Sequence, residues 1–303
     1  MSILVTGAAG FIGSSLANEL NAKGHDVIAL DNLFLGKKEN LSEGVEFRKA
    51  SVMNLAVLRN IFETSNIDYV FHFAALSSNP MFRPSPLDGM NVNIIGFSNI
   101  AEMCKDFNTK KLVYASTSSL YSGNHPPHKE TDSVAPKIHY ETTFYARELI
   151  AQAYFREFGL KSAGMRYFSV YGYNEMHKGE FANLITQFIW GIRKGRQPVI
   201  YGDGEQARDF VFIDDVTQAN ILAMKTGMEG VFNVGTGKSH SINEIIKIIR
   251  GKMDVGIKPK YVRNPLKNYI SHTQADISKI RQFGYEPKIS VEEGIELLIK
   301  HYG

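Results

Sequence analysis

The stretch Ile3-Leu4-Val5-Thr6-Gly7-Ala8-Ala9-Gly10-Phe11-Ile12-Gly13 decides the fold, because an apolar run leads directly into three glycines at three-residue spacing. Apolar residues then recur at helical spacing as far as Leu20, and a second apolar run, Val27-Ile28-Ala29-Leu30, ends at Asp31. The order strand, glycine turn, helix and strand is that of a βαβ unit. Glycines in such a turn let the backbone approach a pyrophosphate, and the helix N-terminus supplies N–H donors. The stretch therefore predicts a dinucleotide-binding unit.

The acid at the tip of the second strand indicates which dinucleotide is bound. Asp31 lies eighteen residues past Gly13, where a carboxylate can bind both hydroxyls of the adenosine ribose. A carboxylate at that place repels a 2′-phosphate, so we expect NAD rather than NADP. A purely structural glycine turn is the alternative, and the strand context and the acid spacing argue against it.

The bulk composition excludes several classes of protein. Hydrophobic residues make up 44% of the 303-residue chain and charged residues 21%, as in an ordinary soluble enzyme. The net charge of +3 is spread along the chain, and the pairs Lys37-Lys38 and Lys110-Lys111 are too short for a nucleic-acid stripe. With Cys104 as its one cysteine, the chain forms no internal disulfide. We find no apolar run long enough to span a membrane and no signal peptide, and we expect a cytoplasmic protein.

The rest of the chain alternates between strand-like and helix-like patterns, which predicts an α/β fold with a doubly wound parallel (Rossmann) sheet. Further strands are expected at Val45–Arg48, Tyr69–Phe73, Lys111–Ala115 and Ser162–Tyr167, and helices at Leu55–Thr64, Val92–Phe107 and Thr143–Phe158. From about Ser169 the loops lengthen and glycine and proline recur. We therefore expect an NAD-binding domain over residues 1–168, with a returning segment at about 211–232. A smaller α/β substrate-binding lobe is expected over 169–210 and 233–303.

Three later segments should meet at the cofactor cleft. Phe73-Ala74-Ala75 ends the expected fourth strand, Ser116-Thr117 ends the fifth, and Tyr140 stands at the start of a helix. Ligands of open α/β sheets bind at the carboxyl ends of the strands. These segments are thus predicted to face the bound dinucleotide.

Taken together, the motifs resemble the extended short-chain dehydrogenase/reductase family, in its branch of NAD-dependent sugar-nucleotide epimerases and dehydratases. The resemblance covers essentially the whole chain. It rests on the glycine turn and on five further motifs, His72-Phe73-Ala74-Ala75, Asn93-Ile94-Ile95-Gly96, Arg166-Tyr167-Phe168-Ser169-Val170-Tyr171-Gly172, Gly202-Asp203-Gly204 with Arg208-Asp209-Phe210, and Asn233-Val234-Gly235-Thr236-Gly237.

The resemblance implies a UDP-sugar 4-epimerase of the UDP-glucose/UDP-galactose type, with Tyr140 and Thr117 as catalytic residues acting on the C4 hydroxyl. It implies that NAD is bound by Gly7, Gly10, Phe11, Ile12, Gly13, Asp31, Asn32, Ser51, Val52, Phe73, Ala74, Ala75, Asn93, Ser116, Tyr140 and Tyr167. It implies that the substrate is bound by Thr117, Ser118, Ser169, Asn183, Leu184, Arg208 and Tyr269. A surface ion pair of Arg208 with an aspartate, and a helix N-cap at Asn183, are the structural alternatives.

One residue departs from the family pattern at the catalytic centre. The family has lysine four residues after its tyrosine, where it binds the nicotinamide ribose and lowers the tyrosine pKa, whereas this chain has Phe144. Arg147 stands seven residues after Tyr140, about 10 Å along a helix axis at ~1.5 Å per residue, and is a possible substitute. A non-catalytic NAD/sugar-nucleotide-binding protein, or another sugar-nucleotide-modifying enzyme such as a reductase, decarboxylase or dehydratase, therefore stays open as an alternative.

Further expectations concern acid catalysis, metals and assembly. Ser118-Ser119 replace the Asp-Glu pair of the dehydratases, and hydroxyls do not supply that acid catalysis, so 4,6-dehydration is disfavoured. The histidines at 125, 128 and 139 lack the spacing of metal ligands, and no metal is expected. The family resemblance suggests a homodimer through the helices expected at Val92–Phe107 and Thr143–Phe158.

Overall fold

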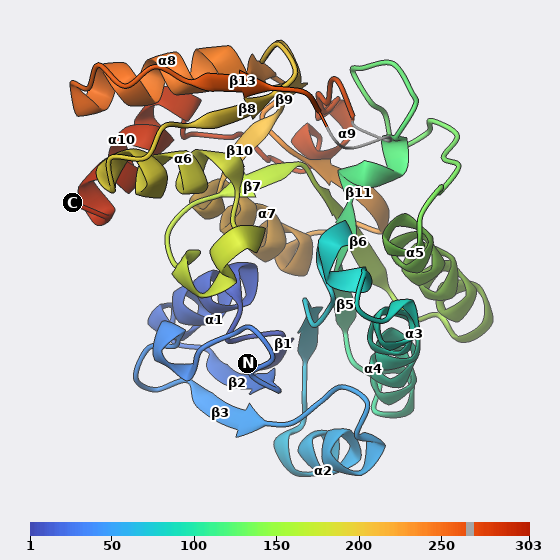
Figure 1. The fold of residues 1–303 in the computed structure, drawn as a ribbon. Coiled ribbons are helices and arrows are strands. Elements are labelled where there is room, and N and C mark those ends of the chain that lie inside the picture. The colour runs from blue at the N-terminus through green and yellow to red at the C-terminus, as the bar shows by residue number, and fades with distance from the viewer. Residues whose placement is uncertain (265–269) are drawn as a thin grey trace.

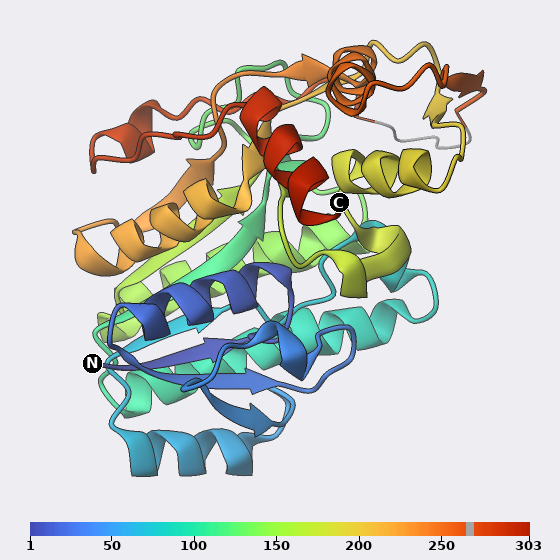
Figure 2. The ribbon, with the colours of Figure 1, turned by 90° about the vertical axis from the view of Figure 1, so that its left-hand side faces the viewer.

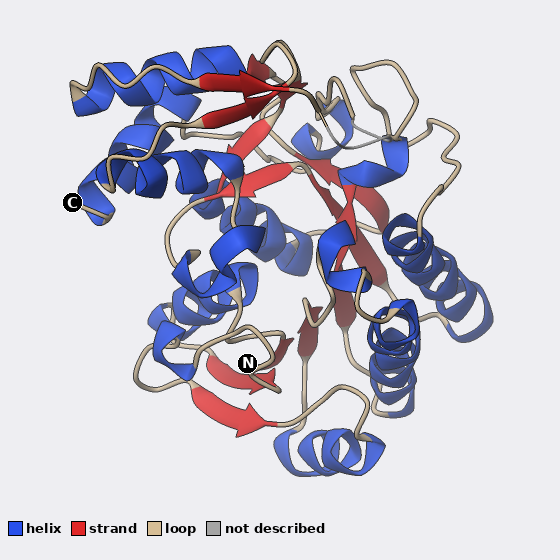
Figure 3. Cartoon of the chain, in the orientation of Figure 1, coloured by secondary structure: helices blue, strands red, loops and turns tan. Residues whose placement is uncertain are grey.

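Seven parallel strands form the central sheet of the protein in a computed structural model that describes residues 1–264 and 270–303. Their order across the sheet is β11-β6-β5-β4-β1-β2-β3 (Figure 1, Figure 3). The strands are β1 (Ser2–Thr6), β2 (Asp26–Asp31), β3 (Glu46–Lys49), β4 (Tyr69–His72), β5 (Lys111–Thr117), β6 (Ser162–Tyr167) and β11 (Gly230–Val234). The predicted α/β class with a doubly wound parallel sheet is confirmed.

Helices cover both faces of this sheet, and the apolar residues of β1 explain why. Ile3 and Val5 point into one core, which the helices α1 (Phe11–Ala22) and α7 (Ile213–Lys225) also line. Leu4 points into a second core, shared with α2 (Leu55–Ser65), α4 (Gly96–Asp106) and α5 (His139–Phe158). Side chains of successive strand residues alternate between the faces, so a strand that is apolar throughout is buried on both sides.

The strand order reverses beside β1, and this places the ligand site. β2 and β3 lie on one side of β1, whereas β4, β5 and β6 lie on the other. The connections after β1 and β4 therefore separate and leave a crevice at the carboxyl ends of the strands. The glycine turn after β1 and the segment Phe73–Ala75 after β4 flank this crevice.

The C-terminal part of the chain forms short strand pairs and helices that lie together above the central sheet (Figure 1, Figure 2). Its strands pair as β7 (Ser169–Tyr171) with β10 (Phe210–Phe212), β9 (Ala207–Arg208) with β12 (His240–Ser241), and β8 (Val199–Tyr201) with β13 (Lys260–Val262). Its helices are α6 (Leu184–Arg193), α8 (Ile242–Met253), α9 (Ser278–Arg281) and α10 (Val291–His301). The short α3 (Pro86–Met90) lies between β4 and α4 in the chain.

The segment expected to return to the sheet divides between two places. Val231–Asn233 lies in β11 and pairs with β6, whereas Val211 lies in β10 and pairs with β7 outside the central sheet. The α7 helix between them packs against α1. The domain boundaries given above stay a prediction.

Two further features of the structure concern membranes and metal ions. Within residues 1–264 and 270–303, the structure has no helix with the length and apolar character needed to cross a bilayer. In the same residues, no cluster of three or more histidine, cysteine, aspartate or glutamate side chains is placed to hold a metal ion.

Candidate active site

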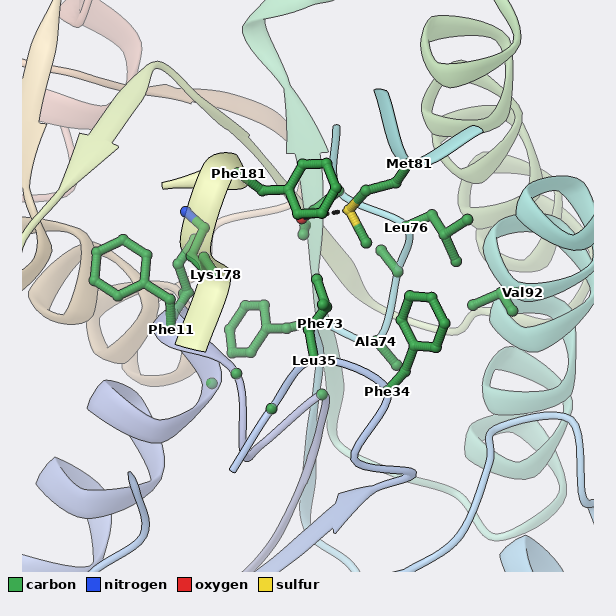
Figure 4. A pocket seen from close by; sticks show the side chains of 18 of the residues that line it. Phe11, Phe34, Leu35, Phe73, Ala74, Leu76, Met81, Val92, Lys178 and Phe181 are labelled. Atoms are coloured by element: carbon green, nitrogen blue, oxygen red, sulfur yellow. Dashed lines mark hydrogen bonds between the residues drawn. The ribbon is translucent and has the colours of Figure 1, made fainter. Parts of the chain in front are cut away.

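A cavity of about 730 Å³ opens at the strand crossover, and most of the predicted cofactor residues line it (Figure 4). A volume of this size accommodates a large organic ligand. The predicted residues on its wall are Gly7, Gly10, Phe11, Ile12, Gly13, Asp31, Asn32, Ser51, Val52, Phe73, Ala74, Ala75, Ser116, Thr117, Ser118, Tyr140, Tyr167 and Ser169. The structure thus brings residues from the first 170 positions of the chain to one cavity.

The glycine turn has the backbone geometry that a dinucleotide requires. Gly7 has a φ of +66°, and a Cβ placed there would lie 2.6 Å from the amide nitrogen of Ala74. A Cβ at Gly13 would lie 2.1 Å from the carbonyl oxygen of Gly7. Side chains at these positions would force the turn apart, and the missing side chains leave the first turn of α1 open to a phosphate.

Asp31 is placed to receive ribose hydroxyls at the end of β2. Its carboxylate accepts hydrogen bonds from the amides of Ala9, at 3.0 Å, and Leu33, at 2.7 Å, which hold it at the cavity wall. Burial raises the pKa of Asp31, and the two amide bonds oppose that rise. The open glycine turn and this buried acceptor are the features that an NAD molecule needs, so the residues present fit this cofactor.

Tyr140 and Thr117 form a hydrogen-bonded pair inside the cavity. The Tyr140 hydroxyl donates to Thr117 Oγ1 at 2.9 Å, although the two residues come from the first turn of α5 and the end of β5. Burial raises the pKa of Tyr140, while hydrogen bonds with Thr117 and Ser119 and the charge of Arg147 act to lower it. The phenol is therefore protonated at neutral pH before a ligand arrives.

Phe144 lies between this phenol and a buried guanidinium. Its ring meets the Tyr140 ring edge-on, with 5.0 Å between the ring centroids, and it lines the cavity. Arg147 lies against the ring of Phe144, with its guanidinium carbon 4.8 Å from the centroid. Arg147 donates to the carbonyl oxygens of Asn93, at 2.8 Å, and Ala74, at 2.9 Å.

Asn93, predicted to bind the cofactor, is fully buried and is not part of the cavity wall that the structure describes. Its side chain accepts from the amide of Leu76 and donates to the carbonyl of Leu76 and to the hydroxyl of Thr143. It lies in a π-helical turn, Asn91–Ile95, a local distortion that is frequent at functional sites. Through these hydrogen bonds, Asn93 joins the loop after β4 to α5.

A buried hydrogen-bond network extends from Ser116 to the C-terminal region. Glu148 accepts from Ser116 and from Arg166, and Arg166 in turn donates to Tyr121. Tyr121 donates to Asn233, at 2.7 Å, and Asn233 also donates to the carbonyl oxygens of His128 and Asp276. Two of the family motifs, at Arg166 and Asn233, therefore belong to one polar network behind the cavity.

Three predicted substrate residues lie outside the cavity wall that the structure describes. Asn183 caps α6 by accepting a hydrogen bond from the amide of Ile185, which is the helix N-cap given above as the structural alternative. Leu184 follows it as the first residue of the helix. Arg208 lies in β9 and donates to carbonyl oxygens of Ala207, Ile270 and Ser271. Tyr269, the fourth, lies outside the described residues. The structure does not bring these residues to Tyr140, and their roles stay predictions.

Several cavity residues were missed in the sequence. They include Phe34, which is 68% exposed, and His177, Lys178 and Phe181 from the segment Met176–Phe181. In Figure 4, Lys178 points toward Phe11, whereas Phe34 and Val92 lie on the opposite side of Phe73. Lys178 also pairs with the buried Glu175 at 2.8 Å. The sequence does show two adjacent basic residues after Gly172. It does not show that they lie near the turn after β1, because that proximity depends on tertiary packing.

Comparison with known proteins gives a consistent assignment. Residues 3–235 match the model of the NAD dependent epimerase/dehydratase family. The chain is 37% identical to a UDP-glucuronate 4-epimerase of Thermodesulfobacterium geofontis, over 97% of this chain and 93% of that protein.

Two solved structures are similar over almost their whole length. One is a UDP-glucose 4-epimerase of Thermotoga maritima with UDP-glucose, at a TM-score of 0.94 and 34% identity, covering 100% of this chain and 98% of that one. The other is a UDP-glucose 4-epimerase of Thermus thermophilus in complex with NAD, at 0.92 and 32%, covering 100% and 99%. Fold, glycine turn and comparisons agree that this chain belongs to the NAD-dependent epimerase/dehydratase family and is an enzyme that uses NAD.

Proposed function

We propose that the protein is a UDP-sugar 4-epimerase that interconverts UDP-glucose and UDP-galactose. The observation that carries this proposal is the 2.9 Å hydrogen bond between the hydroxyls of Tyr140 and Thr117 inside the NAD cavity. Two hydroxyls at this distance can share a third one, so a sugar hydroxyl can be held by both. The relatives named above act on different UDP-sugars, UDP-glucuronate and UDP-glucose, and support 4-epimerisation as the type of reaction.

The chain's part in the reaction is to remove and return one proton. Thr117 orients the C4 hydroxyl, and Tyr140, once ionised, accepts its proton as the C4–H bond breaks. When bound in this cavity, NAD would supply a reversible acceptor for the hydride from C4. The 4-keto sugar turns before the return, so that the C–H bond re-forms on the opposite face and Tyr140 gives the proton back to the oxygen. Atoms and electrons balance, because nothing is lost from the sugar.

The residues after Thr117 favour epimerisation over dehydration. Ser118 and Ser119 begin the short helix Ser118–Tyr121, and both line the cavity. Elimination of a C6 hydroxyl needs an acid to protonate the leaving oxygen, and a serine hydroxyl is too weak an acid for that step. At this point of the cavity wall, the chain therefore lacks the acid that a dehydratase needs.

The cavity wall beside Tyr140 favours a neutral sugar over a uronate. Phe82 meets Tyr140 edge-on at 6.1 Å, which places the segment after β4 next to the phenol. The side chains through which this segment lines the cavity are Leu76, Ser77, Met81, Pro84, Ser85 and Asp88. Besides two serine hydroxyls, this set contains the carboxylate of Asp88 and no cation, whereas a uronate carboxylate is bound most strongly by a cation. For the diphosphate of the substrate we retain Arg208 as the proposed contact.

Purified protein incubated with UDP-glucose is the direct test, with UDP-galactose measured by chromatography or NMR. We expect conversion without net NADH formation, and slower conversion of UDP-glucuronate. Tyr140→Phe should lower kcat by about 10²- to 10⁴-fold, the usual contribution of a general base. Tyr154→Phe is the matched control, because Tyr154 lies on the same helix and donates to Glu102 away from the cavity.

Two results would contradict the proposal. The first is folded, NAD-loaded protein that converts neither UDP-glucose nor UDP-galactose, as expected of a binding protein. The second is net NADH formation, or loss of water or carbon dioxide from the sugar, as expected of another enzyme of the same fold.

We also propose that the enzyme is a homodimer formed through α4 and α5. These helices pack against each other, and α5 leaves Phe155 and Phe158, three residues apart, about half exposed. Apolar side chains on adjoining surface positions favour burial against a second copy. Sedimentation equilibrium should give twice the mass of 33.9 kDa, and a monomer at micromolar concentration would contradict the dimer.

A further inference from the structure

Arg147 is a buried cation with an unusual set of partners. Its side chain is fully buried, and two of its nitrogens donate to main-chain carbonyl oxygens of Asn93 and Ala74. The third, Nη1, is buried without a hydrogen-bond partner among the described residues. No carboxylate lies within ion-pair distance of Arg147 in that part of the chain. A guanidinium keeps its charge at neutral pH, so this charge is held in the interior without an anion.

The neighbouring acid on the same helix does not compensate this charge. Glu148 is directed at β5 and β6, where it forms a 2.6 Å ion pair with Arg166 and accepts from Ser116. The remaining titratable groups that act on Arg147 are Tyr140 on its own helix and Tyr114 from β5. His72 from β4 is also close enough for Arg147 to lower its pKa, although burial is the larger cause. Tyr114 lies in the apolar core, whereas Tyr140 faces the cavity.

Helix geometry places this cation in line with the phenol. Tyr140, Phe144 and Arg147 stand at positions i, i+4 and i+7 of α5, which share one face of a helix. Arg147 lies against the ring of Phe144 at 4.8 Å, and Phe144 meets the Tyr140 ring at 5.0 Å. The ring of Phe144 thus lies between the guanidinium and the phenol, and both Arg147 and Phe144 are buried, so little solvent screens the field of Arg147 on this side.

We propose that Arg147 is a positioning residue that stabilises the ionised Tyr140 during catalysis, so that the transient phenolate is the anion this buried cation otherwise lacks. Resting on the 4-epimerase function proposed above, the role is electrostatic, because Phe144 keeps the guanidinium out of the cavity. The same side chain braces the loop after β4 through the carbonyl of Ala74, which lines the cavity. A buried charge without a counter-ion is costly for stability, and such costs concentrate at functional sites.

Other cations do not share this position in the described structure. Lys178 lines the cavity but pairs with Glu175 and lies over the ring of Phe11, at the end of the cavity near the glycine turn. Among the groups that shift the pKa of Tyr140, Glu141 raises it and Arg147 lowers it. Removal of Arg147 therefore leaves the phenol with a nearby negative charge and without its compensating positive one.

A spectroscopic titration tests this role without requiring turnover. The chain has fourteen tyrosines, so the absorbance of ionised Tyr140 is isolated by subtracting the titration of a Tyr140→Phe protein from that of its parent, both loaded with NAD. We expect Arg147→Met to move the Tyr140 midpoint upward by about one to two pH units, the usual effect of a nearby opposite charge. Arg147→Lys should keep the midpoint near that of the wild-type protein.

Lys111→Met provides a matched control. Lys111 is also buried and also donates to two main-chain carbonyls, of Ala223 and Thr226, but it lies at the opposite end of β5 from Thr117. Its removal should lower stability and leave the Tyr140 midpoint unchanged. Circular dichroism and NAD content establish that each protein is folded, and Arg147→Gln replaces Arg147→Met if the latter does not fold.

The outcomes separate this inference from the proposed function. Equal midpoints in the wild-type and Arg147→Met proteins would overturn the role of Arg147, as would a wild-type phenol that stays protonated until the protein unfolds. If the wild-type protein converts no UDP-sugar, the epimerase function fails while the titration still reports on Arg147. If it does, the alkaline-rising limb of kcat/KM should move with the spectroscopic midpoint in each variant.

Discussion

Two buried arginines, Arg147 on α5 and Arg166 on the strand β6, differ in what surrounds their charge. Arg166 is 3% exposed and is held by both oxygens of Glu148 and by the hydroxyl of Tyr121. Arg147 is fully buried and is held by two carbonyl oxygens and an aromatic ring. Burial opposes both charges, but Glu148 outweighs burial at Arg166 and raises its pKa, whereas burial prevails at Arg147 and lowers its pKa.

The difference indicates two uses of the same side chain. A paired guanidinium is satisfied in the resting protein and joins elements of the fold, here β6, α5 and β5. An unpaired one leaves a positive potential that another charge can satisfy later. Under this interpretation, Arg166 serves structure and Arg147 serves the reaction, and each can be tested by removing the charge and measuring stability and chemistry separately.

The largest effect is expected from breaking the paired arginine. Arg166→Met leaves the Glu148 carboxylate buried without its counter-ion, so the free energy of unfolding should fall by about 3–5 kcal/mol. Chemical denaturation followed by circular dichroism measures this fall. The double variant Arg166→Met/Glu148→Leu should recover most of the loss, because both charges leave together. A double variant as unstable as the single one would show that the pair is not the source of the stability.

The next largest effect is on the reaction rate. It tests whether a cation at position 144 and a cation at position 147 stabilise the ionised Tyr140 in the same way. Arg147→Met should lower kcat at pH 7 by about 10- to 100-fold, which corresponds to one or two pH units in the phenol. Phe144→Lys in that background should restore at least part of the rate, because it returns a cation beside Tyr140. Phe144→Lys alone should give little gain, since two cations would then lie together. Steady-state kinetics measures kcat in each variant. A strong gain in kcat for Phe144→Lys alone would contradict the proposed role of Arg147.

A smaller effect is expected on stability at the unpaired arginine. Arg147→Met removes hydrogen bonds to two carbonyls but also removes an uncompensated buried charge, so unfolding should become easier by only about 1–2 kcal/mol. The same denaturation experiment compares it with Arg166→Met. A loss as large as that of Arg166→Met would erase the distinction between the two residues.

The smallest effect extends the comparison to a buried anion, Asp31, which backbone amides hold and which has no cation partner in residues 1–264 and 270–303. Burial raises its pKa, so protonation on acidification begins at a higher pH than for an ordinary aspartate. Protonation removes an acceptor for the ribose hydroxyls, so NAD affinity is full above this pKa and falls below it, by at most about tenfold per pH unit. Calorimetry between pH 4.5 and 7.5 measures this fall. Asp31→Asn should bind NAD more weakly and without this dependence; an equal slope would assign it elsewhere.

Sequence patterns predicted the central fold because its determinants are local. The apolar runs at Ile3–Val5 and Val27–Leu30 and the glycines between them fall within one βαβ unit, and the structure has β1, α1 and β2 there. Tyr140 and Thr117 were predicted as partners through a family resemblance, and the structure places their hydroxyls 2.9 Å apart. That distance depends on how α5 packs on β5, which spacing alone does not determine.

The remaining site features depend on side-chain direction. Asn93 has the residue type of a ligand-binding group, yet it turns inward to Leu76 and Thr143. Arg147 was one possible substitute for the missing lysine. Its position seven residues after Tyr140 in the sequence does not tell whether its side chain is exposed at the surface or buried. Lys178 reaches the cavity from a loop whose course depends on the packing of the C-terminal elements. These are tertiary outcomes without a local sequence signal.

The hydrogen-bond network from Ser116 to Asn233 has a consequence for how a substrate could move. Asn233 holds main-chain carbonyls of His128 and Asp276, and through Tyr121 and Arg166 it is tied to Glu148 on the catalytic helix. These hydrogen bonds join the segments around His128 and Asp276 to the strand β11 and to α5. In a 4-epimerase, the sugar ring must turn by half a rotation to expose its second face. With these segments held together, that rotation would take place about the pyrophosphate bonds of the nucleotide, while the cavity walls keep their positions.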